Sequence, residues 1–269
     1  MTQTQLRQAG RPTVREADSR DRIVAAMSRV PLRRRRRLRV VVVTVLSLLI
    51  AGYALQRYGG LDPGVARVGL RPGVPWHFPL LVAHILTGCV ALALGPLQLV
   101  RWIRRRPRLH RYVGRAYLFA GVLPASVAGL GVAAMTTAGP IAALGFAVGD
   151  VLWFTTALLG YLAARARRYR DHERWMLRNL ALTFAAVTFR IWLALLIVGQ
   201  LPMLGPVYGG DFTALFHTAY LTTTWLAFIP NVLVVNWWLR VKVSPAHDVD
   251  RTRHAARRLQ PPAGSAAAP

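Results

Sequence analysis

Six long apolar blocks, separated by short polar segments, constrain this chain more than any other feature of its sequence. They run approximately over residues 38–56, 78–100, 112–136, 141–164, 175–199 and 212–239. A helix rises about 1.5 Å per residue, so each block is long enough to cross a hydrocarbon core about 30 Å thick. The blocks are continuous rather than alternating, which argues against an outer-membrane barrel. The predicted fold is an all-α polytopic membrane protein, a bundle of six transmembrane helices.

Composition excludes the main soluble classes. The chain is 54% hydrophobic and yet carries 35 Lys and Arg against 10 Asp and Glu, a net charge of +25. A soluble globular domain does not combine these two properties, and a disordered basic chain would be far less hydrophobic. The single cysteine, Cys89, leaves no intramolecular disulfide and no covalent haem-attachment motif.

The basic residues predict how the bundle is oriented. With the N-terminus inside, 31 of the 35 Lys and Arg fall in segments on the cytoplasmic side, as the positive-inside rule requires. We therefore expect a multi-pass protein of the cell membrane with both ends in the cytoplasm. The expected organisation is a basic, partly disordered tail over 1–37, a membrane domain over 38–240 and a disordered tail over 241–269.

The same charge suggests which partners to expect. Arginines beside membrane spans attract anionic lipid head groups. The two tails lack interleaved aromatic residues and a recognisable DNA-binding helix, so nucleic acid is not an expected partner. The run Arg33–Arg37 precedes the first block without a cleavage site after it, which predicts a retained anchor rather than a removable signal.

Four histidines fall into two levels once this topology is imposed. His84 and His217 lie near the outer ends of the second and sixth spans, and His110 and His172 lie at the inner ends of the third and fifth. A bis-histidine haem b needs imidazoles from facing helices. The layout therefore predicts haem iron ligands, one pair on each side of the membrane. The alternative is that these are interfacial or hydrogen-bonded structural histidines.

Two further groups of charged residues belong to this prediction. Arg115 and Arg178 are positioned to hold haem propionates beside the inner histidines. Asp150 and Arg190 are each about ten residues from the outer ends of consecutive spans, so we expect a buried ion pair near the midplane. Such a pair either sets the helix register or forms a site for a substrate, a proton or a propionate.

Three prolines, Pro96, Pro124 and Pro230, lie within predicted spans. A proline lacks the backbone N–H and clashes with the preceding turn, so we expect a kink at each.

Several ordered motifs in the last five spans resemble the bacterial membrane-protein family catalogued as domain of unknown function 2306. The resemblance covers about residues 78–240 and rests on ALALGPLQ at 91–98, LHRYVGRAY at 109–117, DHERWMLR at 171–178, TFRIW at 188–192 and NWWLR at 236–240. The motif positions are His84, Gly95, Gln98, His110, Arg111, Gly114, Arg115, Tyr117, His172, Trp175, Arg178 and Arg190. The resemblance implies an integral membrane protein and no particular activity. The histidine layout is also loosely similar to transmembrane di-haem b-type cytochromes, by analogy only.

Three kinds of function remain open from the sequence. The first is a haem b electron-transfer protein, and the second is a transporter or sensor of a small solute or lipid that uses the Asp150–Arg190 site. The third is a non-catalytic membrane scaffold. The chain contains no phosphate-binding loop, dinucleotide fingerprint or zinc-protease motif that would point to a familiar enzyme class.

Overall fold

The computed structural model describes residues 14–66 and 69–242, and their regular elements are helices. The α-helices are α2 (Val14–Tyr58), α3 (His77–Leu94), α4 (Arg101–Arg104), α5 (Pro107–Ala116), α6 (Leu123–Met135), α7 (Pro140–Arg165), α8 (Tyr169–Thr183), α9 (Ala185–Gln200), α10 (Phe212–Leu226) and α11 (Ile229–Lys242). Shorter elements are the 3-10 turns η1 (Pro63–Val65), η2 (Pro96–Leu99) and η4 (Leu201–Met203), and the π-helix η3 (Tyr117–Val122).

These elements combine into six stretches that are long and apolar enough to cross a membrane. They are Arg37–Tyr58, His77–Leu99, Pro107–Met135, Pro140–Arg165, Tyr169–Met203 and Phe212–Val241. Each overlaps one predicted apolar block, which confirms the all-α fold class and the six predicted spans.

The first helix begins well before its apolar part. Residues 14–37, which we expected to be partly disordered, are helical and belong to α2. Residues 1–13 and 243–269, which make up most of the rest of the two predicted tails, lie outside the described residues.

Each of the three prolines coincides with an irregularity. Helix α3 ends at Leu94 and the 3-10 turn η2 begins at Pro96, while Pro230 follows the break between α10 and α11. Pro124 comes directly after the π-helix η3. A proline removes one backbone donor, so the preceding turn must change its hydrogen bonding. Each predicted kink position thus coincides with a change of helix type or a helix end.

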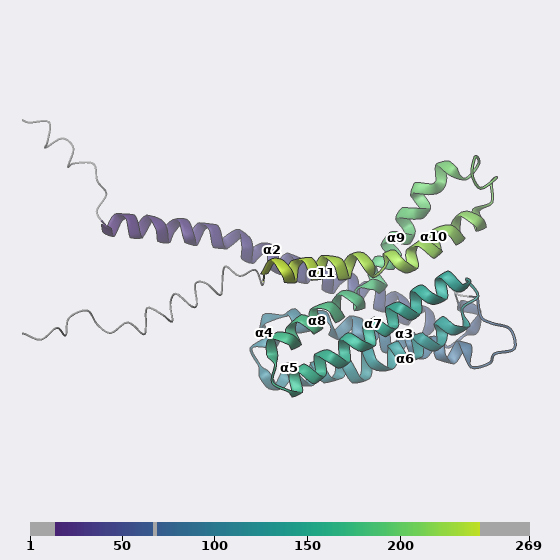
Figure 1. Ribbon diagram of the computed structural model, residues 1–269, viewed down its shortest axis with the longest axis horizontal. Coiled ribbons are helices and arrows are strands. Elements are labelled where there is room, and N and C mark those ends of the chain that lie inside the picture. The colour runs from purple at the N-terminus through teal and green to yellow at the C-terminus, as the bar shows by residue number, and fades with distance from the viewer. Residues whose placement is uncertain (1–13, 67–68, 243–269) are drawn as a thin grey trace, which may run out of the picture.

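The fifth span has a break that no proline causes. Helix α8 ends at Thr183 and α9 begins at Ala185, and Phe184 between them closes a separate turn with its N–H 2.9 Å from the carbonyl of Leu180. Helix α8 packs along α7, whereas α9 turns away to pack with α10. Figure 1 shows α9 and α10 projecting from the rest of the bundle as a separate arm.

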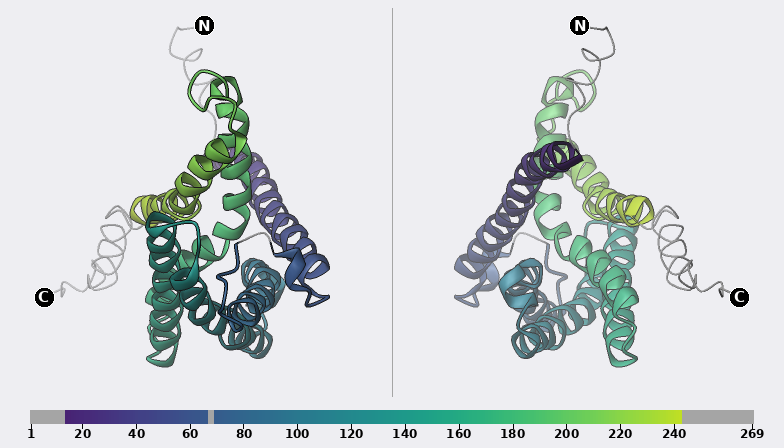
Figure 2. Two further views of the ribbon diagram at one scale, coloured as in Figure 1. Left: turned by 90° about the vertical axis from the view of Figure 1, so that its right-hand side faces the viewer. Right: turned by 90° about the vertical axis from the view of Figure 1, so that its left-hand side faces the viewer.

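The main body of the bundle consists of α3, α6, α7 and α8, with α2 packed against α3 (Figure 2). Small residues allow close approach between these helices, as is usual in membranes. A Cβ atom on Gly121 of η3 would lie 3.0 Å from the backbone nitrogen of Ala91 on α3. Both residues adjoin the buried core around Tyr117 and Val122.

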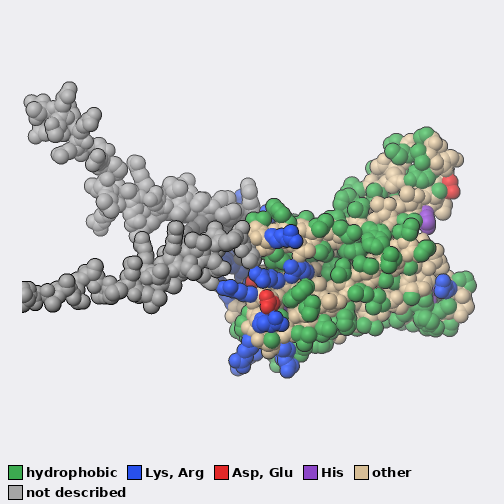
Figure 3. Space-filling model, viewed as in Figure 1, with side chains coloured by type: hydrophobic (Ala, Val, Ile, Leu, Met, Phe, Trp, Pro, Cys, Tyr) green, Lys and Arg blue, Asp and Glu red, His purple; other side chains and the backbone are tan. Residues whose placement is uncertain are grey.

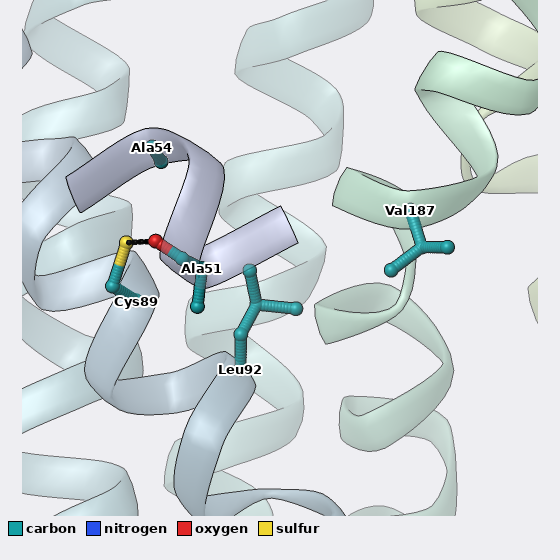
Figure 4. Packing of buried hydrophobic residues seen from close by; sticks show 5 residues of the cluster. All are labelled: Ala51, Ala54, Cys89, Leu92 and Val187. Atoms are coloured by element: carbon teal, nitrogen blue, oxygen red, sulfur yellow. Dashed lines mark hydrogen bonds between the residues drawn. The ribbon is translucent and has the colours of Figure 1, made fainter. Parts of the chain in front are cut away.

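A second apolar contact joins α2, α3 and α9. Ala51 and Ala54 of α2 pack with Cys89 and Leu92 of α3 and with Val187 of α9 (Figure 4). The Cys89 thiol is buried and lies 3.6 Å from the carbonyl oxygen of Ala51, to which it donates. Cys89 is therefore a packing residue with a weak hydrogen bond.

The described basic residues gather at one end of the bundle. Figure 3 shows most of the arginine and lysine side chains at the end that carries α4, α5 and the start of α8. The last residues of α11 reach the same end, and α2 extends beyond it (Figure 1). The side of the bundle between the two ends is largely apolar, as lipid contact requires.

Candidate functional site

Two titratable side chains from different spans meet inside the bundle. His84 lies on α3 and Asp150 on α7, and both flank Gly129 of α6. A Cβ atom on Gly129 would lie 2.7 Å from Nδ1 of His84 and 2.8 Å from Cγ of Asp150. Because glycine has no side chain, the imidazole and the carboxyl group can share this space. We term His84 and Asp150 the midplane centre, since Asp150 lies near the middle of the 26-residue helix α7.

A hydrogen bond across the helix interface orients the imidazole. Nδ1 of His84 lies 2.9 Å from the carbonyl oxygen of Ala125, one turn before Gly129 on α6. A carbonyl oxygen can only accept, so Nδ1 carries the proton. Nε2 of the neutral ring is then an acceptor, and no described group hydrogen-bonds to it. The same contact commonly orients metal-binding and proton-transferring histidines.

The Asp150 carboxyl group has no partner among the described residues. Its side chain is half-buried, and neither a hydrogen bond nor an ion pair reaches its oxygens. Asp171, at the basic end, by contrast lies 3.5 Å from Arg168 and 3.7 Å from Arg174. An unpaired carboxylate within a membrane span costs at least about 2.5–3.5 kcal/mol. Asp150 is therefore the residue in the spans whose charge most needs an explanation.

Arg190 does not supply the missing charge. Its guanidinium Nη1 donates to the carbonyl oxygen of Ala186 on its own helix, 2.6 Å away. Arg190 is within electrostatic range of Tyr53 and Tyr58 of α2 and of Cys89 of α3. The predicted ion pair between Asp150 and Arg190 is not formed in this structure.

The break in the fifth span explains this correction. Asp150 lies ten residues after the start of α7, and Arg190 lies ten residues before the end of α9. Only α8 follows α7 closely, however, and the break at Phe184 directs α9 toward α2 and α10. Arg190 is carried away from Asp150 with α9, to the α2 side of the bundle.

The two outer histidines have different surroundings. His84 faces α6 and α7, whereas His217 lies on α10, which packs against α7 and α9. The His217 side chain is exposed and makes no hydrogen bond with the described residues. The outer haem between these two imidazoles stays a prediction.

The inner histidines, His110 of α5 and His172 of α8, are within electrostatic range of each other. His110 is also within electrostatic range of Arg104. Nδ1 of His172 lies 2.8 Å from the carbonyl oxygen of Gly160 on α7 and donates to it. Nδ1 of His110 is buried and has no hydrogen-bond partner. Within the described part of the chain, no group of three His, Cys, Asp or Glu is arranged to hold a metal ion.

The two arginines predicted as propionate contacts have different surroundings. Arg178 donates from Nε to Oδ1 of Asn236, 2.8 Å away, and its guanidinium lies 4.8 Å from the ring centre of Trp175. It therefore links α8 to α11. Arg115 is exposed and has no partner among the described residues.

A buried hydrogen-bond network lies between the midplane centre and the inner end. The Tyr117 hydroxyl donates to Oδ1 of Asn179 at 2.5 Å and lies 2.7 Å from Oγ1 of Thr183. Trp153 donates from Nε1 to Thr183 at 2.9 Å. Asn179 also donates to Thr156 and to the carbonyl of Trp153. Every side chain in this network has a partner, and Tyr117 and Asn179 are almost fully buried.

All these polar contacts lie along one face of α7. Asp150, Trp153, Thr156 and Gly160 follow each other at intervals of three and four residues, which places them on one side of a helix. Asp150 belongs to the midplane centre, Trp153 and Thr156 to the network, and Gly160 accepts from His172. We term these four residues the polar face of α7.

One sequence signal could have identified part of this face. Asp150 is uncommon inside a span because of its charge, and Gly129 leaves room for neighbouring side chains. Their proximity depends on how α6 packs on α7, which no spacing in the sequence specifies. The Tyr117 network likewise joins residues that are 62 and 66 positions apart.

Comparison with protein families agrees with the motifs described above. Residues 81–239 match the family described as "Predicted membrane protein (DUF2306)". The match covers all but the first span and the ends of the chain. Comparisons with curated proteins and with solved structures give no match. The chain belongs to this family of predicted membrane proteins.

Proposed function

We propose that this membrane protein is a proton-linked transporter, and that the Asp150 carboxyl group is its proton-binding group within the membrane. The observation that carries this proposal is the unpartnered carboxyl group beside His84. A carboxylate in an apolar span is stabilised by taking up a proton or by a cation. No described cation reaches Asp150, so the proton is the simplest partner.

The chemistry of the centre favours positively charged or donating ligands. With Nδ1 of His84 donating to Ala125, the centre offers the carboxylate oxygens of Asp150 and Nε2 of the ring. All of these atoms are acceptors when the aspartate is ionised. A solute carried with the proton would accordingly be cationic or rich in hydrogen-bond donors.

The polar face of α7 supports movement of the proton from Asp150 toward the basic end. Beyond Asp150, the hydroxyl groups of Tyr117 and Thr183 lie 2.7 Å apart, and both act as donor and acceptor. The Gly160–His172 contact lies further along the same face. Hydroxyl groups and imidazoles in such an order are typical of proton relays in membrane proteins.

The charge distribution supports an orientation for this transport. The described arginines gather at the end where α11 finishes (Figure 3), and positive charge favours the cytoplasmic side. We therefore place both chain ends in the cytoplasm of a plasma-membrane protein, with the basic end against anionic lipid head groups.

Proton uptake by reconstituted vesicles tests the function. The full chain is incorporated into vesicles that contain a pH-sensitive dye, and a potassium diffusion potential drives proton entry. We expect wild-type vesicles to acidify faster than vesicles with Asp150→Asn, because the amide cannot bind a proton. Asp211→Asn is the matched control: Asp211 caps α10 by accepting from the Thr213 amide at 2.7 Å, and asparagine caps equally well.

The proposal is overturned if wild-type vesicles acidify no faster than those with Asp150→Asn. It is also overturned if Asp211→Asn reduces the rate as much as Asp150→Asn, since the effect would then be a general one of lost carboxyl charge.

A further inference from the structure

Two buried polar atoms near the basic end have no hydrogen-bond partner. They are Nε2 of Gln98, in the turn η2, and Nδ1 of His110, on α5. Buried polar side-chain atoms in folded proteins are nearly always hydrogen-bonded, to protein, water or a bound ligand. Two unpartnered atoms in one region therefore indicate a group that the protein itself does not supply.

One face of α5 relates the two residues, since it carries His110 and Gln98 lies against it at Gly114. A Cβ atom on Gly114 would lie 3.6 Å from Oε1 and 4.0 Å from Nε2 of Gln98. Gly114 follows His110 by four residues, which is one helical turn on the same face. The glycine thus leaves room beside the Gln98 amide group, on the face of α5 that carries His110.

The charges around this region are mainly positive. His110 is within electrostatic range of His172 and Arg104. Two acidic residues flank His172: Glu173 is mostly exposed and lies 3.6 Å from Arg104, and Asp171 pairs with Arg168 and Arg174. His172 donates from Nδ1 toward Gly160 and therefore away from this region. Arg104 keeps further guanidinium N–H groups that one carboxylate does not use.

We propose that Gln98 and His110 form a binding site for an oxyanion, with Arg104 supplying the surrounding positive charge. The Gln98 amide nitrogen is a donor only, so its partner must be an acceptor. An imidazole donates to an oxyanion from either ring nitrogen, and hydrogen bonds to a charged group are the stronger kind. Phosphate oxygens fit this description, whether they come from a lipid head group or from free phosphate. The site is separate from the midplane centre and does not depend on the proposed transport.

Binding of inorganic phosphate and of anionic lipid tests this site. The thermal unfolding of the detergent-solubilised full chain is measured against phosphate concentration. It is then compared between nanodiscs of phosphatidylglycerol and nanodiscs of phosphatidylcholine. We expect saturable stabilisation in at least one of these two experiments, the phosphate titration or the nanodisc comparison. Stabilisation by phosphate alone identifies a free-ion site, and stabilisation only by phosphatidylglycerol identifies a head-group site.

Variants separate this site from general attraction to the basic surface. Gln98→Met keeps the side-chain volume and removes the donor, so the apparent affinity falls about tenfold or more, as loss of one hydrogen bond to a charged group predicts. Gly114→Ala should also weaken binding, because its methyl group fills the space beside Gln98 at ordinary contact distance. That substitution keeps the helix intact, so it reports on the site even if Gln98→Met fails to fold.

The control is Arg106→Gln, on the same basic end. Arg106 is exposed and lies 3.9 Å over the Trp102 ring, so its loss lowers the surface charge without touching the site. The proposal is overturned if neither probe stabilises the protein. It fails equally if Arg106→Gln weakens binding as much as both other variants do. A haem absorption band in the purified protein, lost with His110→Leu, would assign these histidines to haem and also overturn the proposal.

Discussion

Two polar clusters lie on the same face of α7, one turn apart, and they differ in how well their groups are satisfied. In the network around Tyr117 and Asn179, each side chain has a hydrogen-bond partner from a neighbouring helix. In the midplane centre, Asp150 has none and His84 leaves one ring nitrogen free. A network whose groups are all hydrogen-bonded stabilises the bundle. An unpaired carboxylate within a membrane span destabilises it until a proton or a cation binds. The comparison assigns a structural role to the first cluster, whose hydroxyl groups also lie on the proposed proton path, and ligand chemistry to the second.

The largest expected effect is on the satisfied cluster. Asn179→Leu removes the partners of Tyr117 and Thr156 and leaves their hydroxyl groups with fewer hydrogen bonds inside the bundle. We expect the free energy of unfolding in detergent to fall by about 2–4 kcal/mol. Asn236→Leu, which removes the acceptor of Arg178 on the half-buried helix α11, is the control and should cost less. Equal losses from the two variants would show that the network has no special structural role.

The next effect concerns the space at Gly129. A methyl group there would overlap both His84 and Asp150, so Gly129→Ala forces one of them to move. We expect a loss of about 1–3 kcal/mol in stability, typical of overpacking, together with loss of proton uptake. Gly88→Ala on α3, where a Cβ atom meets nothing within 4 Å, should leave both unchanged. An unchanged proton-uptake rate in Gly129→Ala would mean that the centre does not need its present geometry.

The smallest expected effect is the coupling between Asp150 and Arg190. Because they do not interact in the structure, the stability changes of Asp150→Asn and Arg190→Gln should add in the double variant to within about 0.5 kcal/mol. Asp150→Asn alone should cost little, since no partner is lost. Urea unfolding of the four proteins measures this coupling. A coupling well above that value would restore the ion pair that the sequence predicted.

Much of the fold could be predicted because lipid imposes strong rules on sequence. Helices that cross a membrane must be long and apolar, so the six blocks and their order follow from hydropathy. The irregularities at Pro96, Pro124 and Pro230 follow from the backbone N–H group that proline lacks. The break at Phe184 has no such signal, because the residues around it are ordinary helix-compatible ones.

The candidate site could be predicted only in part, mainly because the helix break at Phe184 could not be predicted. Depth along a helix can be counted from the sequence, and it correctly singled out Asp150, His84 and Arg190 as charged or titratable residues within spans. Which of them face each other depends on the rotation and direction of each helix. The sequence therefore suggested Arg190 as the partner of Asp150. In the structure, the packing of α3, α6 and α7 instead brings His84 beside Asp150.

Infrared spectroscopy of the carboxyl groups tests most directly whether Asp150 binds a proton within the membrane. Difference spectra are recorded on the reconstituted full chain as the buffer is changed from alkaline to mildly acidic. A proton-binding Asp150 predicts a carbonyl band of a protonated carboxyl group in an apolar environment, present in the wild type and in Asp211→Asn and absent from Asp150→Asn. Identical difference spectra for the wild type and Asp150→Asn would contradict it.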